Sequence, residues 1–419
     1  MRLHMDSMTP TTSNDTGRLV FFVTRVSTTI PIPNAEVRVF SVEEPDNLLY
    51  TLITNSSGQT EGITLPTPPL SYSLNPDSPQ PFSQYRFIIL AEGYEPLTIN
   101  GSELLADETS IQPAALVPVR FGTGAGTIDI PIHTLVGDYP SKTPEAEIKP
   151  EAETGEIVLS RVVIPETIIV HDGVPDDATA PNYYVPYRDY IKNVVSSEIF
   201  PTWPESAIYA NTLAIMSFTL NRVYTEWYRN RGYNFTITSS TAFDQKFIYG
   251  RNIYANIDRI VDSIFNNYLS RPGVKQPIFT SYCDGKRTTC RGLSQWGSMY
   301  LGEEGYSAID IIRYYYGNDM FINTADQIEG VPASWPGYDL TIGSRGSKVL
   351  QLQQQLNRIK RNYPALPGVS EDGIYGPGTA ESVRSFQQIF NLNPTGVTDF
   401  ATWYSISNIY VGVTEIAEP

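Results

Sequence analysis

Residues 183–200 read YYVPYRDYIKNVVSSEIF, and this stretch decides how the middle of the chain is interpreted. From Tyr187 onward the apolar side chains stand at positions 187, 190, 191, 194 and 195, which is one face of an α-helix. The next position on that face is Glu198, shortly before Pro201 forces the helix to stop. The spacing therefore predicts a carboxyl group at the end of an apolar helical face.

Two interpretations of this glutamate follow. Apolar surroundings raise the pKa of a carboxyl group, which suits a general acid near neutral pH. Most glutamates are exposed, however, and a glutamate at a helix end can simply turn into the solvent. The helical pattern alone does not decide between the two.

The residues after this stretch predict a second, well-buried helix. It begins at Thr202 or Trp203, carries Pro204 in its first turn and runs to about Tyr228.

Further along, the chain alternates between strand and helix signals. Residues 279–282 (FTSY) predict a strand. Ser307 and Asp310 form a capping box for another helix, which Gly317 ends. Residues 158–330 are thus a mixed α+β region.

Four motifs stand in this region: Tyr190-Ile-Lys-x-Val-Val-x-x-Glu198, Trp203-Pro-x-x-Ala207, Ser294-Gln295-Trp296-Gly297 and Ile311-Ile-x-Tyr-Tyr-Tyr-Gly317. In family order, they resemble the SpoIID/LytB family of sporulation peptidoglycan enzymes. The resemblance implies a SpoIID-like catalytic domain over residues 158–330 with Glu198 as its catalytic acid. It also implies that the pair Ser294 and Gln295 lies near the cleft.

Four side chains are candidates to hold the glycan: Tyr282, Ser294, Gln295 and Trp296. Trp296 also fits a role in the core. The sequence departs from the family at 288–292, where TTCRG replaces the usual Gly-His-Gly. Some relatives bind zinc through cysteines that are missing from residues 239–245, so we expect no metal and no other cofactor.

Residues 338–408 predict a compact three-helix module. Val349, Leu352, Leu356 and Ile359 share one helical face. Thr379 or a neighbour caps a second helix, Trp403 lies on a short third one, and the tail after Ile406 is expected to fray.

The module resembles the peptidoglycan-binding-1 family through Gly343-Ser-Arg-Gly346, Asp372-Gly-Ile-Tyr-Gly-Pro377, Val383-x-x-Phe-Gln387, Thr395-Gly396 and Ala401-Thr-Trp403. The resemblance implies a non-catalytic wall anchor, which raises the local concentration of substrate.

Residues 18–140 predict an antiparallel β-sandwich, because short strands recur at regular intervals. The clearest candidates are residues 18–26, 35–42 and 85–91. The motifs Pro33-Asn-Ala-Glu-Val-Arg-Val39 and Thr54-Asn-x-x-Gly58 resemble those of transthyretin-like, carboxypeptidase-regulatory sandwiches. Residues 1–17 are expected to be disordered. Residues 141–157, with five glutamates, are expected to form a solvated acidic linker open to proteases.

The composition excludes several classes of partner. The 419-residue chain carries a net charge of −16, which repels nucleic acid and teichoic acid. The sequence contains no run of 18 apolar residues, so no membrane span is expected, and residues 1–17 lack the pattern of a secretory signal.

The three histidines, His4, His133 and His171, lie too far apart in sequence for a helical zinc motif. Cys283 and Cys290 could be a nucleophile, ligands, a disulfide or plain residues.

The whole is a multidomain α+β chain that resembles the clostridial spore cortex-lytic enzymes. The resemblance implies a zymogen whose sandwich is a pro-domain and whose linker is cut by a subtilisin-like germination protease of the Csp type. It implies lytic transglycosylation of cortex peptidoglycan, yielding 1,6-anhydro-MurNAc. Synthesis in the mother cell and storage in the spore cortex or coat would need no signal peptide. Two alternatives remain: a muramidase with Asp244 or Asp284 as second carboxylate, and a non-catalytic binding protein or amidase enhancer.

Overall fold

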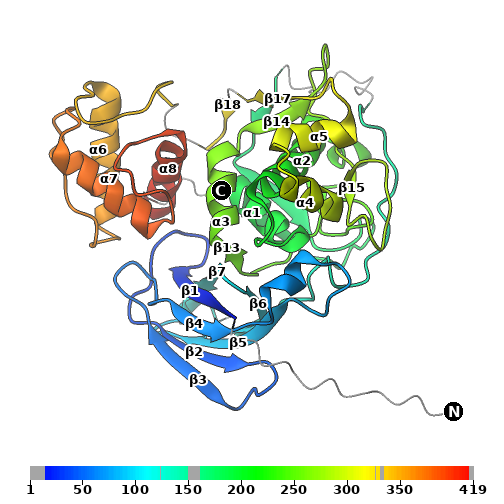
Figure 1. The fold of residues 1–419 in the computed structure, drawn as a ribbon. Helices are drawn as coiled ribbons and strands as arrows, with labels where there is room; N and C mark the ends of the chain where they lie inside the picture. The colour runs from blue at the N-terminus through cyan, green and yellow to red at the C-terminus, as the bar shows by residue number, and fades with distance from the viewer. Residues whose placement is uncertain (1–14, 123, 150–160, 326, 331–334, 415–419) are drawn as a thin grey trace.

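The computed structural model describes residues 15–122, 124–149, 161–325, 327–330 and 335–414. The chain is a mixed α+β protein with several sheets (Figure 1). A β-sandwich lies below a central part of helices and short strands, and three C-terminal helices lie to the left of the central part, above one end of the sandwich. No helix in the described ranges is long and apolar enough to cross a membrane.

The N-terminal part consists of two sheets, with strand orders β13-β7-β1-β4 and β3-β2-β5-β6-β8. The strands are β1 (Thr16–Arg25), β2 (Glu36–Ser41), β3 (Leu48–Ile53), β4 (Ile63–Pro66), β5 (Phe82–Leu90), β6 (Leu97–Leu105), β7 (Thr109–Leu116), β8 (Gly126–Asp129) and β13 (Ile253–Tyr254). Alternate side chains face inward, so that Phe21 of β1 packs edge-on against Phe87 of β5 with ring centres 4.7 Å apart.

Two expectations for this part were wrong in detail. The sheets are not purely antiparallel, because β1 pairs with β7 in parallel and β6 pairs with β8 in parallel. The chain turns between β6 and β7 at Asp107, whose φ is 60°, and enters the opposite sheet beside β1. The predicted disorder of residues 1–17 extends too far, since β1 begins at Thr16; residues 1–14 lie outside the described residues.

The sandwich and the central part share a sheet. β13, which follows the sandwich by more than a hundred residues, pairs with β7 at Ile253 and Tyr254. Beside this pairing, Arg251 donates to the Glu103 carboxylate at 3.0 Å, and both side chains are 0% exposed. Asn252 donates to the Glu103 carbonyl and accepts from its backbone amide. The two parts therefore meet through a ladder and a buried charge pair.

The central part is built around two helices, α1 (Tyr187–Glu198) and α2 (Glu205–Tyr224). The remaining helices are α3 (Ala255–Ile264), α4 (Gln295–Glu303) and α5 (Ala308–Tyr316). The short strands are β9 (Val163–Ile164), β10 (Thr167–His171), β11 (Asn182–Pro186), β12 (Ile237–Thr238), β14 (Asn267–Ser270), β15 (Tyr282–Cys283), β16 (Leu293–Ser294), β17 (Phe321–Thr324) and β18 (Gln327–Ile328).

The helix predictions in this region hold better than the strand prediction. The helix over the stretch that ends at Glu198 is confirmed, and Ser307 caps α5 as predicted. α2 ends earlier than expected, because Glu226 adopts a φ of 44°. Of the predicted strand 279–282 only Tyr282 belongs to a strand, and the Phe279 amide donates instead to the carbonyl of Glu147.

The bond to Glu147 also shows that the prediction of a solvated acidic linker over residues 141–157 was wrong for its first half. Its first half is packed on the central part: Lys149 is 3% exposed, and Glu145 and Glu147 each pair with an arginine of the central part. The composition predicted a solvated segment, but the two glutamates form ion pairs with arginines on the surface of the central part. Residues 150–157 lie outside the described residues.

The C-terminal module contains α6 (Ser347–Lys360), α7 (Pro377–Ile389) and α8 (Phe400–Thr414). α7 is capped by Gly376 with Pro377 as its first residue, so Thr379 lies inside the first turn instead of capping it. The expected fraying after Ile406 is wrong, because Ile409 and Val413 are buried and Arg358 donates to the Val413 carbonyl. The third helix is therefore long, not short.

Candidate functional site

The end of α1 places Glu198 inside the protein. Ten of the twelve residues of α1 are buried, including Tyr190, Val194 and Val195 on the apolar face. Ile199 is extended, with φ −138°, and ends the helix before Pro201. The Glu198 side chain is 5% exposed, so the alternative of a glutamate turned into the solvent is wrong.

Three donors surround the Glu198 carboxyl group. The Lys246 amide donates to Oε1 at 2.9 Å, and Gln295 Nε2 donates to Oε2 at 3.1 Å. The Tyr282 hydroxyl lies 3.4 Å from Oε1. These bonds fix both oxygens, and the surroundings are polar as well as apolar. A carboxyl group held in this way is oriented for proton exchange with one bound group.

The four predicted glycan-binding residues divide into two pairs. Tyr282 and Gln295 contact Glu198. Ser294 Oγ accepts from the Gly297 amide at 3.0 Å as the N-cap of α4. Trp296 is 4% exposed and packs against Trp203 with ring centres 5.0 Å apart, which places it in the core.

Replacing Ser294 by alanine should therefore act on folding more than on a ligand. Loss of an N-cap bond costs about 1 kcal/mol of stability. Urea denaturation should show this decrease for Ser294→Ala, while Ser294→Thr, which keeps the hydroxyl, stays close to the parent. Equal stability of the alanine variant and the parent would contradict the capping role.

Two residues near Glu198 escaped the sequence analysis. Lys246 contributes a backbone amide, which no side-chain pattern reveals. Gln245 is fully buried, accepts from the Tyr190 hydroxyl at 3.1 Å and from Thr219 Oγ1 at 2.8 Å, and thereby holds the chain at Lys246. The feature that marks this segment is the complete burial of Gln245 next to the charged Lys246. Burial of this kind is known only from the folded structure, so the sequence could not reveal it.

The two aspartates considered as a second carboxylate are already engaged. Asp244 is 0% exposed and accepts from Arg222, Tyr228 and Thr238. Asp284 accepts from three amides of its own loop, at Lys286, Arg287 and Thr288. Although partial burial alone would raise it, those amide bonds hold the pKa of Asp284 below its usual value. Both aspartates therefore act as structural acceptors.

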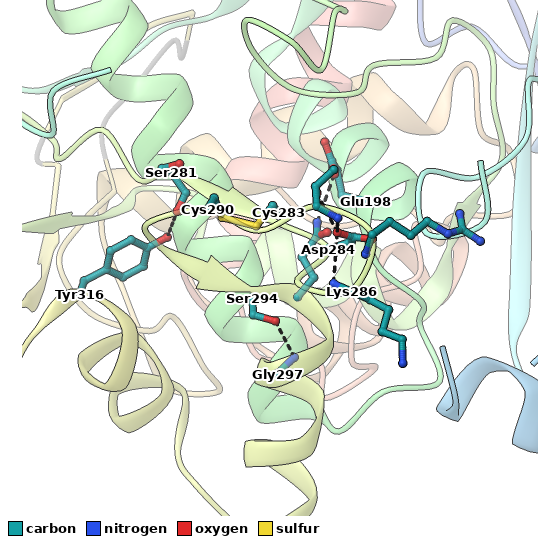
Figure 2. Close-up of a disulfide and its surroundings, with 12 residues drawn as sticks. Glu198, Ser281, Cys283, Asp284, Lys286, Cys290, Ser294, Gly297 and Tyr316 are labelled. Atoms are coloured by element: carbon teal, nitrogen blue, oxygen red, sulfur yellow. Dashed lines mark hydrogen bonds between the residues drawn. A yellow bond between two sulfur atoms is a disulfide. The ribbon is translucent and has the colours of Figure 1, made fainter. Parts of the chain in front are cut away.

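The loop of Asp284 is closed by a disulfide between Cys283 and Cys290 (Figure 2). Of the roles left open for these cysteines, the structure selects this one. The bridge follows Tyr282 directly, so it restrains the strand that brings the Tyr282 hydroxyl to Glu198. Within the described residues no group of three or more His, Cys, Asp or Glu side chains is arranged to hold a metal.

Residues 139–149, which we call the strap, pack against the residues around Glu198. Lys142 Nζ lies 4.0 Å from the ring centre of Tyr282 and 4.6 Å from that of Phe218. Tyr139 lies under the Lys246 ammonium at 5.3 Å, and the Thr143 amide donates to Ala242. A cavity of about 170 Å³ opens elsewhere, among Arg222, Trp227 and Phe235, and Glu198 does not line it.

Residues 345–406 match the family model described as a putative peptidoglycan binding domain. This part of the chain is a peptidoglycan-binding domain. The match begins just before α6 and ends within α8, and it indicates association with the cell wall. No curated protein sequence matches the chain.

The peptidoglycan-binding domain is docked on both other parts. Asn391, just after α7, donates to Asp258 Oδ2 at 2.7 Å and to the Ala255 carbonyl of α3. Its Tyr363 hydroxyl donates to the carbonyl of Thr29 in the sandwich at 2.6 Å. The peptidoglycan-binding domain therefore has a fixed place beside the central part in this structure (Figure 1).

Proposed function

We propose that the protein is a peptidoglycan lytic transglycosylase, held as a zymogen, of the type of the spore cortex-lytic enzyme SleC. The observation that carries the proposal is the single buried carboxyl group of Glu198, oriented by Lys246, Gln295 and Tyr282. The peptidoglycan-binding domain supports a wall substrate.

The proposed reaction needs one carboxyl group. Glu198, protonated, gives its proton to the glycosidic oxygen between MurNAc and GlcNAc, and the C1–O bond breaks. The 6-hydroxyl of the same MurNAc then attacks C1, and Glu198 takes back the hydroxyl proton. The products are a 1,6-anhydro-MurNAc end and a free GlcNAc 4-hydroxyl, with no water consumed.

The engaged state of the aspartates favours this reaction over a muramidase. A hydrolase of the two-carboxylate type needs a second carboxylate free to bind water or attack C1. Asp244 and Asp284 are both committed to protein donors. The non-catalytic alternative, a wall-binding protein or amidase enhancer, becomes an outcome of the experiment below.

The strap supports the zymogen part of the proposal, because it packs on Tyr282 and Lys246, the two residues that contact Glu198 Oε1. In this proposal a subtilisin-like germination protease cuts after the strap, in the span 150–160, and the location of the protein is the spore. Cortex peptidoglycan is the substrate. Neither a metal nor an organic cofactor takes part.

Product analysis tests the proposal. A recognition sequence for a specific protease is placed within residues 150–160, the chain is cut, and cut and uncut chains are incubated with purified cortex. We expect fragments ending in anhydro-MurNAc by mass spectrometry, released faster by the cut chain. Reducing MurNAc ends would identify a muramidase instead. If neither the cut nor the uncut chain digests cortex, the result would favour the non-catalytic binding protein.

A further inference from the structure

The strap brings a positive charge to the candidate catalyst. Lys142 Nζ is shielded from solvent and has no hydrogen-bond partner among the described residues; it rests on the ring of Tyr282, whose hydroxyl contacts Glu198. Burial lowers the pKa of Lys142 to about 8, against the attraction of Glu198 and Asp244. In the proposed reaction, positive charge develops on the sugar whose glycosidic oxygen Glu198 protonates.

The strap then presents two carboxylates in alternate positions. Glu145 is held by Arg222, whose NH1 and NH2 donate to its two oxygens at 2.8 and 2.6 Å. Glu147 is held by Arg271, which donates through Nε and through NH2 at 2.9 Å. Paired donors of this kind match the geometry of a carboxylate.

Both guanidinium groups have other partners that stay when the strap leaves. Arg222 Nε donates to Asp244 at 2.6 Å, and Arg271 also donates to Asp319 and to the Tyr316 carbonyl. Neither arginine depends on the strap for its position. Removal of the strap would therefore leave two oriented pairs of N–H donors facing the uncovered surface.

We infer that the strap occupies the substrate-binding surface beside Glu198, and that Arg222 and Arg271 are subsites for carboxylates on the peptide stems of the substrate. This inference rests on the proposed function and deepens it. An extended chain rises about 3.3 Å per residue, so Glu145 lies on the order of 10 Å along the strap from Lys142. In the proposed complex the cleaved glycosidic bond lies at Glu198, and the peptide stems project from the glycan. A distance of this order would place the carboxylates of those stems at the arginines.

Binding is the appropriate test, in the full chain carrying Glu198→Gln so that nothing is cut. The strap is loosened by Glu145→Gln with Glu147→Gln, which leaves the arginines intact. The probes are a glycan fragment with peptide stems bearing free carboxylates and the same fragment with those carboxylates amidated. Calorimetry gives affinity, and hydrogen exchange at the Thr143 and Lys149 amides reports whether the strap is displaced.

We expect the loosened chain to bind the free-carboxylate fragment about tenfold more tightly than the chain with the native strap. Amidation of the fragment should remove that gain, and so should adding Arg271→Gln. Arg229→Gln is the matched control, because Arg229 is an exposed arginine of the same part, paired only weakly with Glu226. Arg222 is left unchanged because its loss would leave the buried Asp244 carboxylate without its salt-bridge partner.

Equal affinity of the loosened and native-strap chains would overturn the inference, as would equal effects of Arg271→Gln and Arg229→Gln. Binding by the peptidoglycan-binding domain is common to all variants and cancels in the comparison. Because only binding is measured, the affinities can be interpreted even if the protein does not catalyse the proposed reaction. Conversely, Glu198-dependent cutting with no carboxylate preference would refute the subsites alone.

Discussion

Glu198→Gln is expected to reduce the rate of cortex cutting by about 10²- to 10⁴-fold, the usual contribution of a general acid or base. Glutamine keeps the size of the side chain and an oxygen able to accept from the Lys246 amide, but it cannot exchange a proton. The loss should therefore appear mainly in the rate at which cut fragments are released, with a small cost in stability because the new NH2 group faces the Gln295 Nε2 donor. The chain cut within residues 150–160 is the form to assay.

The matched control is Glu205→Gln. Glu205 is the exposed first residue of α2, seven positions from Glu198, and the substitution makes the same charge change. Its activity should equal that of the parent. If Glu198→Gln retains parental activity while its melting temperature is unchanged, the carboxyl group is not the catalyst, and the function must be sought in binding.

The second large effect concerns stability. Glu103→Leu leaves the Arg251 guanidinium buried without its carboxylate, since both side chains are 0% exposed. Removing one partner of a buried pair costs about 3–5 kcal/mol. Chemical denaturation should show a loss of that size in the free energy of unfolding.

A double variant separates the charge from the packing. Glu103→Leu with Arg251→Met replaces the pair by apolar side chains and should recover most of the loss. The exposed pair Arg384–Glu381 provides the comparison, because Glu381→Ala should cost less than about 1 kcal/mol. A loss below about 1 kcal/mol for Glu103→Leu would mean that water reaches Arg251.

The sequence predicts the local structures that depend on neighbouring residues. The helix that ends at Glu198 follows from apolar spacing, and the cap at Ser307 follows from a short-range hydrogen bond. The peptidoglycan-binding domain follows from a dense series of motifs, and the family match supports it. For the helix and the cap the information lies in neighbouring residues, and for the domain it lies in motifs spread along residues 343–403.

Features that depend on distant partners were not predictable in this way. The strap reads as a linker because its charges meet Arg222 and Arg271 only after folding. The extension of α8 depends on Arg358, on another helix. Within the site, Glu198 could be singled out and Gln295 placed near it, whereas the Lys246 amide could not, because every residue but proline carries one.

The shared sheet of β7 and β13 bears on what a break in the backbone would do. A cut between residues 150 and 160 severs one covalent link and leaves the ladder and the Glu103–Arg251 pair untouched. The two fragments then stay together as a one-to-one heterodimer, and the strap, now near the C-terminal end of the first fragment, can detach while the β7–β13 ladder holds. Activation would therefore need no separation of the fragments, and size-exclusion chromatography of the cut, active protein should still show one species of parental mass.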